Sequence, residues 1–278
     1  MKVGVKIIFD SVTTIEEKFI NLTNNSFDNC QLDVWDQSLM SDENVQLLKS
    51  LMHKYNVTVS AFWCGWEGPQ VWDFYDGPKT LGLLPEEYRE MRIGNLINGL
   101  DFAKKLGIKD VATHMGFIPE NPNDPQFIPL CDAIKTVAEH AKQNDQYILF
   151  ETGQETPVAM LRCFEQINLD NLGVNLDTAN LILYGKANPV DALDVLGKYV
   201  RNIHAKDGMY PTNGQKLGVE TKIGDGKVDF FALIEKLYQL GYDGYITIER
   251  EISGEQQNTD ILHARDYLNN IISNVCGG

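Results

Sequence analysis

The chain has 278 residues, of which 24 are basic and 39 acidic, so its formal net charge is −15 at pH 7. Apolar residues make up 43% and charged residues 23%, which is the composition of a globular protein and excludes a disordered or fibrous chain. The acidic balance argues against nucleic-acid and anionic-membrane partners, because both are bound through basic surfaces.

Short apolar runs rich in β-branched residues alternate with longer stretches of helical period along the chain. In chain order, these runs predict strands over Val3–Phe9, Leu32–Asp36, Val57–Trp63, Asp110–His114, Tyr147–Glu151, Leu172–Asp177, Val200–Ala205 and Gly244–Glu249. Helical patterns follow them, and the clearest predict helices over Asp42–Tyr55, Pro85–Leu106, Pro129–Gln143 and Asp229–Leu240.

Strands that alternate with helices indicate βαβ units and therefore a parallel sheet. Eight such units in a chain of this length predict a single-domain α/β fold, a (β/α)8 TIM barrel over residues 1–278. An open doubly wound sheet is the alternative, but the segment FDSVT at residues 9–13 lacks the glycine-rich nucleotide fingerprint. Long irregular stretches at residues 65–82, 115–126 and 207–228 follow predicted strands and are expected to be binding loops.

Membrane and secretion signals are missing from the sequence. No apolar run approaches the roughly 18 residues of a transmembrane helix, and the N-terminus reads directly into a strand without a signal-peptide pattern. The five cysteines are scattered and form no CxxC pair, as expected of thiols in a reducing compartment. We therefore expect a cytoplasmic protein without a membrane partner, and a homo-oligomer stays open.

Charged or imidazole side chains lie at the carboxyl ends of the last four predicted strands, namely Glu151, Asp177, His204 and Glu249. A barrel interior otherwise favours Val, Ile and Leu at such positions. Because the strand ends of a barrel converge on one axis, we expect these side chains to meet. Three carboxylates cannot pack together as anions without a cation, so the sequence predicts a bound divalent metal ion. Separate ion pairs or helix caps are the alternative.

The predicted ligand set, three carboxylates and one imidazole, is hard and rich in oxygen. It favours Mn²⁺, Mg²⁺ or Co²⁺, with Zn²⁺ as an alternative. One such ion would leave the site with a net charge of about −1, which suits a neutral polyol better than an anion. The expected partner is therefore a small-molecule sugar.

Several segments around these residues form a familiar pattern: FETGQE at 150–155, NLDTAN at 175–180, IHAKDG at 203–208, GDGKVDF at 224–230 and TIERE at 247–251. Together they resemble the sugar phosphate isomerase/epimerase family, xylose-isomerase-like TIM barrels related to the ketose 3-epimerases and more distantly to endonuclease IV. The resemblance spans roughly residues 110–251. It implies a single divalent metal held by Glu151, Asp177, His204 and Glu249. It also implies that Glu151 and Glu249 are the acid–base pair in members that epimerise ketoses.

Two features depart from the epimerase pattern. Asn180 stands where those enzymes often place a substrate-binding histidine, and the arginine that commonly follows the histidine of their seventh strand has no counterpart, since Tyr210 and Pro211 occupy that stretch. Both departures weaken the case for a particular ketose.

Four side chains are predicted to bind substrate: His114, Trp63, Asn180 and Lys206. Lys206 points the same way as His204 if the strand continues, and could instead neutralise the carboxylates. His114 could be a buried histidine without a catalytic role, and Trp63, like Trp66, could belong to the core. The GDG segment at residues 224–226 could cradle a phosphate before a helix, although Asp225 would repel one.

The predicted activity is that of a metal-dependent isomerase or epimerase of a sugar or sugar-like hydroxy-carbonyl compound. Glu151 or Glu249 would remove the proton beside the carbonyl, and the resulting cis-enediolate would be reprotonated. Expulsion of a β-hydroxyl would instead make the protein a dehydratase, a lyase of a keto-sugar or keto-cyclitol. A non-catalytic carbohydrate-binding barrel is disfavoured because no metal ligand is missing. Endonuclease IV-like repair is disfavoured by the acidic charge and by only five histidines.

Overall fold

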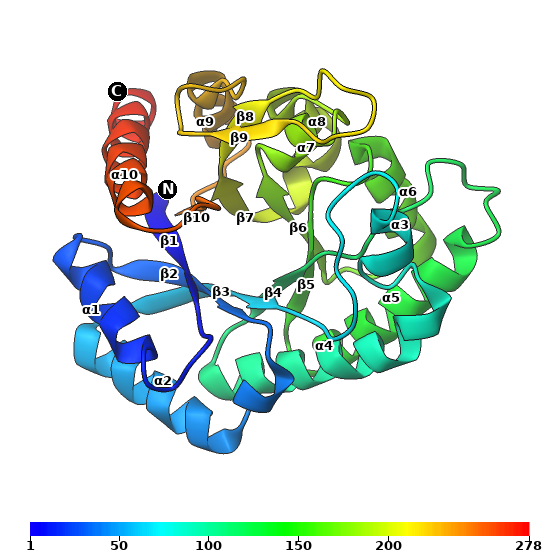
Figure 1. Ribbon diagram of the computed structural model, residues 1–278, viewed down its shortest axis with the longest axis horizontal. Helices are drawn as coiled ribbons and strands as arrows, with labels where there is room; N and C mark the ends of the chain where they lie inside the picture. Colours follow the sequence, from blue (N-terminus) through cyan, green and yellow to red (C-terminus); the bar gives the residue numbers. More distant parts are fainter. Residues whose placement is uncertain (278) are drawn as a thin grey trace.

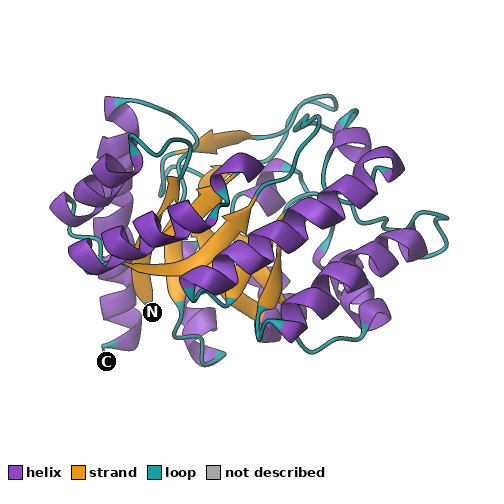
Figure 2. Ribbon diagram, turned by 90° about the horizontal axis from the view of Figure 1, so that it is seen from below, coloured by secondary structure: helices purple, strands orange, loops and turns teal. Residues whose placement is uncertain are grey.

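The computed structural model describes residues 1–277 of the chain. The barrel strands in this range are β1 (Lys2–Ile8), β2 (Asn29–Val34), β3 (Thr58–Cys64), β4 (Asp110–Thr113), β5 (Tyr147–Glu151), β6 (Leu172–Asp177), β7 (Val200–Ala205) and β10 (Tyr245–Ile248). They are parallel and close in the order β1-β10-β7-β6-β5-β4-β3-β2. Helices surround them on the outside (Figures 1 and 2). The predicted (β/α)8 TIM barrel is confirmed.

Local sequence explains where several helices begin and end. Helix α2 begins after Ser41, whose side chain accepts the Asn44 N–H, and it ends at Asn56 in the left-handed conformation. Helix α6 begins with a proline after Thr156, a second side-chain cap. The helices of residues 1–277 are α1 (Ile15–Asn24), α2 (Asp42–Tyr55), α3 (Gly77–Thr80), α4 (Glu86–Leu106), α5 (Phe127–Gln143), α6 (Pro157–Ile167), α7 (Asn180–Leu183), α8 (Pro189–Leu196), α9 (Phe230–Gln239) and α10 (Glu255–Cys276), with 3-10 turns at Gln37–Leu39 and Gly197–Tyr199.

Helix α5 begins two residues before the predicted Pro129. The carboxylate of Asp124 accepts the N–H of Gln126 at 2.8 Å, and its carbonyl accepts the N–H of Phe127 at 3.0 Å. This turn starts the helix at Phe127. Pro129 then lies in the first helical turn, where its missing N–H is not needed.

The space between strands and helices is filled by apolar side chains, whereas the barrel interior combines polar side chains with a small apolar cluster of Trp63, Ala112 and Leu149. Phe150 packs against Phe164 with ring centroids 4.7 Å apart, a contact typical of the outer layer. Inside the barrel, the Asn202 side chain donates to Asn175 at 2.6 Å. Strand register places Asp177 beside His204. The polar side chains of the barrel interior therefore extend to the carboxyl ends of the strands, where the site is predicted.

A short hairpin that the sequence analysis did not predict follows β7, formed by β8 (Asp207–Met209) and β9 (Val219–Thr221). The Asp207 carboxylate accepts four backbone N–H groups, those of Gly208, Gly224, Gly226 and Val228. The glycine N–H groups of the GDG segment at residues 224–226, which could have bound a phosphate, are therefore already used by the carboxylate of Asp207. A Cβ on Gly226 would lie 2.0 Å from the Asp207 Oδ1, so this close approach requires glycine.

The loop at residues 65–82 is anchored to α4 by a buried arginine and by Asn95, which exchanges two hydrogen bonds with Glu67. Arg92 is fully buried and donates to the carbonyl oxygens of Glu67, Gly82 and Pro69 at 3.0, 2.7 and 2.9 Å. Its guanidinium lies 4.0 Å from the centre of the Trp66 ring. Trp66 therefore belongs to the packing beneath the loop. For this tryptophan, the alternative of a core residue applies.

Arg92→Met is expected to lower the free energy of unfolding by about 3 kcal/mol, because buried carbonyl oxygens lose charged donors. Chemical denaturation checks this value. Lys105→Met on the same helix is the control, since Lys105 makes only a surface ion pair with Asp42 and its loss should cost below about 1 kcal/mol. Equal losses in both variants would mean that Arg92 does not anchor the loop.

Two further sequence observations can be compared with the structure. Within residues 1–277, no helix combines the length and the apolar character needed to cross a membrane. All five cysteines of this range are free, and Cys131 and Cys163 lie in van der Waals contact, with sulfur atoms 3.5 Å apart.

Candidate active site

The side chains predicted at the strand ends lie together at one end of the barrel. Glu151 and Asp177 end β5 and β6, His204 is the next-to-last residue of β7, and Glu249 directly follows β10. One ligand atom of each residue lies within 4.8 Å of those of the other three, and all four residues are buried. The four carboxylate and imidazole groups therefore form a compact set that could hold a metal ion.

His204 presents one ring nitrogen to the carboxylates and the other to a glutamine. Its Nδ1 lies 3.2 Å from an oxygen of Glu151, 3.2 Å from one of Glu249 and 3.7 Å from one of Asp177. Its Nε2 lies 2.6 Å from the Gln31 Oε1. Because an amide oxygen can only accept, Nε2 carries a proton and Nδ1 faces the carboxylates, which is how metal-binding histidines are oriented.

Asp177 divides its two oxygens between the backbone and the centre of the cluster. Oδ1 accepts the N–H groups of Ala179 at 2.9 Å and Asn180 at 2.7 Å. Oδ2 is buried without a hydrogen bond. Burial raises the pKa of Asp177 to about 6, although Lys206 acts in the opposite direction. The Oδ2 atom is compensated only by an ion pair with the Lys206 Nζ at 3.2 Å, and a buried carboxylate oxygen of this kind fits a cation ligand.

Two lysines contribute positive charge to the site. Lys206 is buried, and its Nζ lies 3.2 Å from Asp177, 3.1 Å from Glu249 and 3.3 Å from Glu251. Lys6 of β1 pairs with Asp33 at 3.2 Å and also contacts Glu249. Of the two predicted roles for Lys206, these contacts match neutralisation of the carboxylates.

The electrostatics keep Glu151 and Glu249 ionised. Burial acts to raise the pKa of Glu151, but the neighbouring His114 and His204 outweigh it and lower that pKa to about 2. Burial also opposes ionisation of Glu249, yet Lys206, Lys6 and His204 hold its pKa well below the usual range. Both side chains are therefore carboxylates at neutral pH, the form that a metal ligand and a base both require.

A cavity of about 880 Å³ opens above the cluster, and three of the predicted substrate-binding residues line it: Trp63, His114 and Asn180. The Trp63 indole N–H donates to Glu151, and the Asn180 amide donates to the same carboxylate at 3.5 Å. His114 lies 3.5 Å from it. Lys206 lies among the buried carboxylates and is not part of the described cavity lining.

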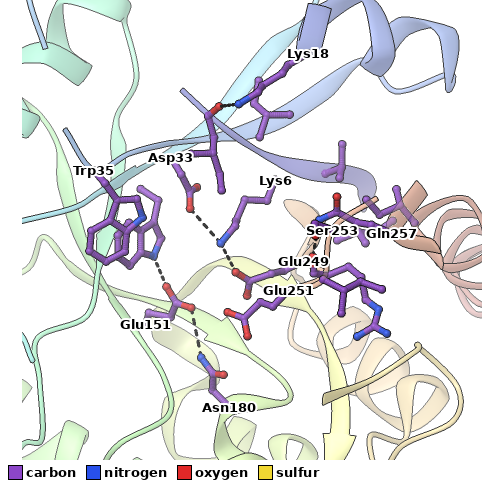
Figure 3. Close-up of a pocket in the computed structure, with 18 of the residues that line it drawn as sticks. Lys6, Lys18, Asp33, Trp35, Glu151, Asn180, Glu249, Glu251, Ser253 and Gln257 are labelled. Carbon is purple, nitrogen blue, oxygen red and sulfur yellow. Dashed lines mark hydrogen bonds and ion pairs between the residues drawn. The ribbon is translucent and has the colours of Figure 1, made fainter. Parts of the chain in front are cut away.

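The structure adds residues that the sequence analysis did not identify. Lys6 and Asp33 face the cavity beside Glu249 (Figure 3), and Gln31 supports His204. Trp35 packs against Trp63 in a tilted arrangement with ring centroids 4.6 Å apart. Trp72, from the loop at residues 65–82, has its ring centroid 4.9 Å from that of His114. Lys6, Asp33 and Gln31 are charged or amide residues inside a buried strand, and this was the sequence feature that could have revealed them.

Comparisons with known proteins agree with this geometry. The model of the xylose isomerase-like TIM barrel family matches residues 23–271. A xylose isomerase domain protein from Planctomyces limnophilus is 30% identical, with 99% of both chains covered and a TM-score of 0.92. A D-tagatose 3-epimerase-like protein is 23% identical and covers 100% of this chain and 99% of its own, with a TM-score of 0.78.

Among curated relatives, an inosose dehydratase from Lacticaseibacillus casei is 26% identical over 52% of this chain. The alignment covers 54% of that relative, so the chain matches about half of its length. The family match extends over most of the barrel, including the strands that carry Glu151, Asp177, His204 and Glu249. This chain is therefore a member of the xylose isomerase-like TIM barrel family.

Proposed function

We propose that this protein is a divalent-metal-dependent isomerase or epimerase of a sugar or sugar-like hydroxy-carbonyl compound. The observation that carries the proposal is the meeting of two ionised glutamates, Glu151 and Glu249, on either side of the His204 Nδ1 beneath the cavity. The likeness to a D-tagatose 3-epimerase-like protein supports a sugar substrate.

Glu151, Asp177, His204 and Glu249 are the proposed metal ligands. The buried Oδ2 of Asp177, which makes no regular hydrogen bond and has only Lys206 as an ion-pair partner, and the orientation of His204 by Gln31 fit a cation at their centre. The hard donor set favours Mn²⁺, Mg²⁺ or Co²⁺ over Zn²⁺. When bound, such an ion supplies Lewis-acid polarisation of a substrate carbonyl and its neighbouring hydroxyl.

The two glutamates are placed for proton transfer on opposite sides of a substrate. They come from β5 and β10, which are separated in the barrel by β6 and β7. One carboxylate removes the proton beside the carbonyl and later releases it to solvent, while the other takes up a proton from solvent and delivers it to the opposite face, which inverts that carbon. Return of the proton to the neighbouring carbon gives the aldose–ketose isomer instead.

Surrounding residues hold these carboxylates in place and limit access of water. Trp63 and Asn180 hold Glu151 through N–H groups, while Lys6 and Lys206 hold Glu249. The indole of Trp35 extends the apolar wall formed by Trp63. A sugar can place its C–H face against such a wall while its hydroxyl groups face the polar centre.

Dehydration is the second candidate reaction. It begins with the same proton removal but ends with loss of a β-hydroxyl, which leaves more readily if a proton donor is close. The glutamate that has taken up the proton can return it to that hydroxyl, whereas Lys6 can only donate a hydrogen bond to it, because Asp33 and Glu249 outweigh burial and raise the pKa of Lys6. The similarity to an inosose dehydratase over half the chain points in the same direction.

Incubation with a panel of ketoses and keto-cyclitols in D₂O with Mn²⁺, followed by NMR, tests both reactions. An epimerase introduces one deuterium at the inverted carbon, an isomerase introduces it at the carbon next to the new carbonyl, and a dehydratase yields an enone or its enol. Activity should disappear after chelation and return with Mn²⁺. Turnover that survives complete metal removal, or no reaction with any hydroxy-carbonyl compound, would contradict the proposal.

Gln31→Leu tests the support of the metal site. Without an acceptor at Nε2, the His204 ring no longer holds its tautomer, so Mn²⁺ affinity is expected to fall about 10–100-fold. Gln31→Glu keeps an acceptor at the same atom and is the control. Titration with Mn²⁺ measures both variants, and unchanged affinity in Gln31→Leu would remove this role.

A further inference from the structure

The cavity above the glutamates has a second part, the outer lobe, which lies between α1 and α10. Its lining includes Asn21 and Leu22 of α1, Ser253 in the loop before α10, and Asn258 and Ile261 of α10. Figure 1 shows β1 running between these two helices. Figure 3 shows Ser253 and Gln257 on the side of Lys6 away from Glu151. The outer lobe therefore continues the reaction site past Lys6 toward the edge of the barrel.

The size of the whole cavity exceeds what one sugar ring needs. A six-carbon sugar has the volume of roughly six water molecules, or about 200 Å³ at about 30 Å³ per water. The cavity measures about 880 Å³. A monosaccharide bound at Glu151 and Glu249 would leave the outer lobe to solvent, whereas binding sites usually enclose most of their ligand.

The outer lobe alternates amide or hydroxyl groups with apolar side chains. Within residues 1–277, the side chains of Asn21, Ser253 and Asn258 make no hydrogen bond to the protein and are exposed. Between them lie the partly exposed Ile261 and the buried Leu22. Such a lining matches a group with hydroxyl edges and C–H faces.

The charges of the outer lobe do not suit an anion. Lys18 is bound to the Asp10 carboxylate at 2.6 Å and to a backbone carbonyl. Arg250 is bound to Glu220 at 2.9 Å and to Asp260 at 2.8 Å. Among the described residues of the lobe, both cations are thus already paired, and a phosphate would find no uncompensated positive charge.

We propose that the outer lobe binds a neutral, hydroxyl-rich group attached to the reacting sugar, so that the substrate is a glycoside or keto-disaccharide and neither a free monosaccharide nor a sugar phosphate. This inference rests on the proposed function, because the reacting sugar is taken to lie at Glu151 and Glu249. The inference adds to that function the class of substrate that the site prefers.

Solvent deuterium exchange measured with three ketoses tests the inference. D-fructose, a disaccharide with a neutral hexosyl group on O6 of fructose, and fructose 6-phosphate are compared with the Mn²⁺-loaded protein. The value of kcat/KM for the disaccharide is expected to exceed that for fructose at least about tenfold, which corresponds to 1.4 kcal/mol. The phosphate should be the poorest substrate. Equal values for fructose and the disaccharide, or a preference for the phosphate, would overturn the inference while the proposed function stands.

A matched pair of variants locates the effect. Asn258→Trp fills the outer lobe and is expected to lower the disaccharide-to-fructose ratio of kcat/KM about tenfold. Asn269→Trp makes the same change at an exposed position of α10 that does not line the cavity, and should keep the ratio. If none of the three ketoses exchanges, saturation-transfer NMR of disaccharide binding still tests the lobe, and the wider panel of ketoses and keto-cyclitols decides the proposed function. If Asn258→Trp and Asn269→Trp bind the disaccharide equally strongly, the proposed role of the outer lobe is refuted.

Discussion

Glutamine in place of Glu249 is expected to slow turnover of the substrate to product by about 10²–10⁴-fold, even when the metal site is saturated. Glutamine keeps an oxygen in the same position but cannot accept a proton at neutral pH. The same loss is expected for Glu151→Gln, since both carboxylates face the cavity in the ionised form. Steady-state rates and deuterium exchange at increasing Mn²⁺ concentrations measure the effect.

The two variants also separate epimerisation from a one-base reaction. If the substrate is epimerised, at least one variant should retain deuterium exchange without inversion, because a single remaining base can still remove and return a proton on its own face. Glu235→Gln, on the exposed face of α9, is the control for the substitution itself. Full recovery of both site variants by excess Mn²⁺ would make the glutamates ligands only, with Lys206 the next candidate for the base.

Lys206→Met is expected to lower the free energy of unfolding of the metal-free protein by about 3–5 kcal/mol. Lys206 is buried against Asp177 and Glu249, and removal of one partner from a buried ion pair leaves charge without compensation. Mn²⁺ should recover part of this loss, since it brings positive charge to the same carboxylates and binds only the folded state. Urea denaturation with and without Mn²⁺ measures both quantities.

The control for this variant is Lys227→Met, because Lys227 is exposed and lies on the connection between β9 and α9. A change within about 0.5 kcal/mol is expected there. Should Lys206→Met be as stable as the unaltered chain, the carboxylates would not depend on this lysine for compensation.

The predictable part of the site consists of polar residues at the ends of apolar strands, where the hydrophobic pattern would lead one to expect another apolar side chain. The strands Tyr147–Glu151, Leu172–Asp177 and Val200–Ala205 have the predicted bounds, because each apolar run stops at a polar or loop-forming segment. A carboxylate or imidazole at such an end has no packing role in a barrel. The convergence of Glu151, Asp177 and His204 follows from the closed topology alone.

Residues within the first two strands were missed for the opposite reason. Lys6 lies between Val5 and Ile7, and Asp33 follows Leu32, so each reads locally as the polar position of an alternating strand. Alternation normally marks a half-exposed strand. Only barrel closure shows that these positions face the axis and the carboxylates, because that depends on pairing between β1 and β10.

Loop contacts could not be predicted either, since they depend on long-range packing without a periodic signal. Trp72 contacts His114 from a loop that Arg92 and Asn95 of α4 hold in place. The hairpin of β8 and β9 consists of strands of three residues, which are too short for a pattern to reveal. The Asp207 carboxylate that organises it lies next to the metal-site segment and reads as one more acidic residue.

Metal binding by the unaltered chain and by His204→Ala and Asp177→Asn tests the central claim most directly. Calorimetric titration of the metal-free proteins with Mn²⁺, with circular dichroism to verify folding, is the measurement. We expect one Mn²⁺ per unaltered chain and a large loss of affinity in both folded variants, because each removes a ligand that the other three cannot replace. Full occupancy of one Mn²⁺ in both variants, with unchanged affinity, would contradict the four-ligand metal site.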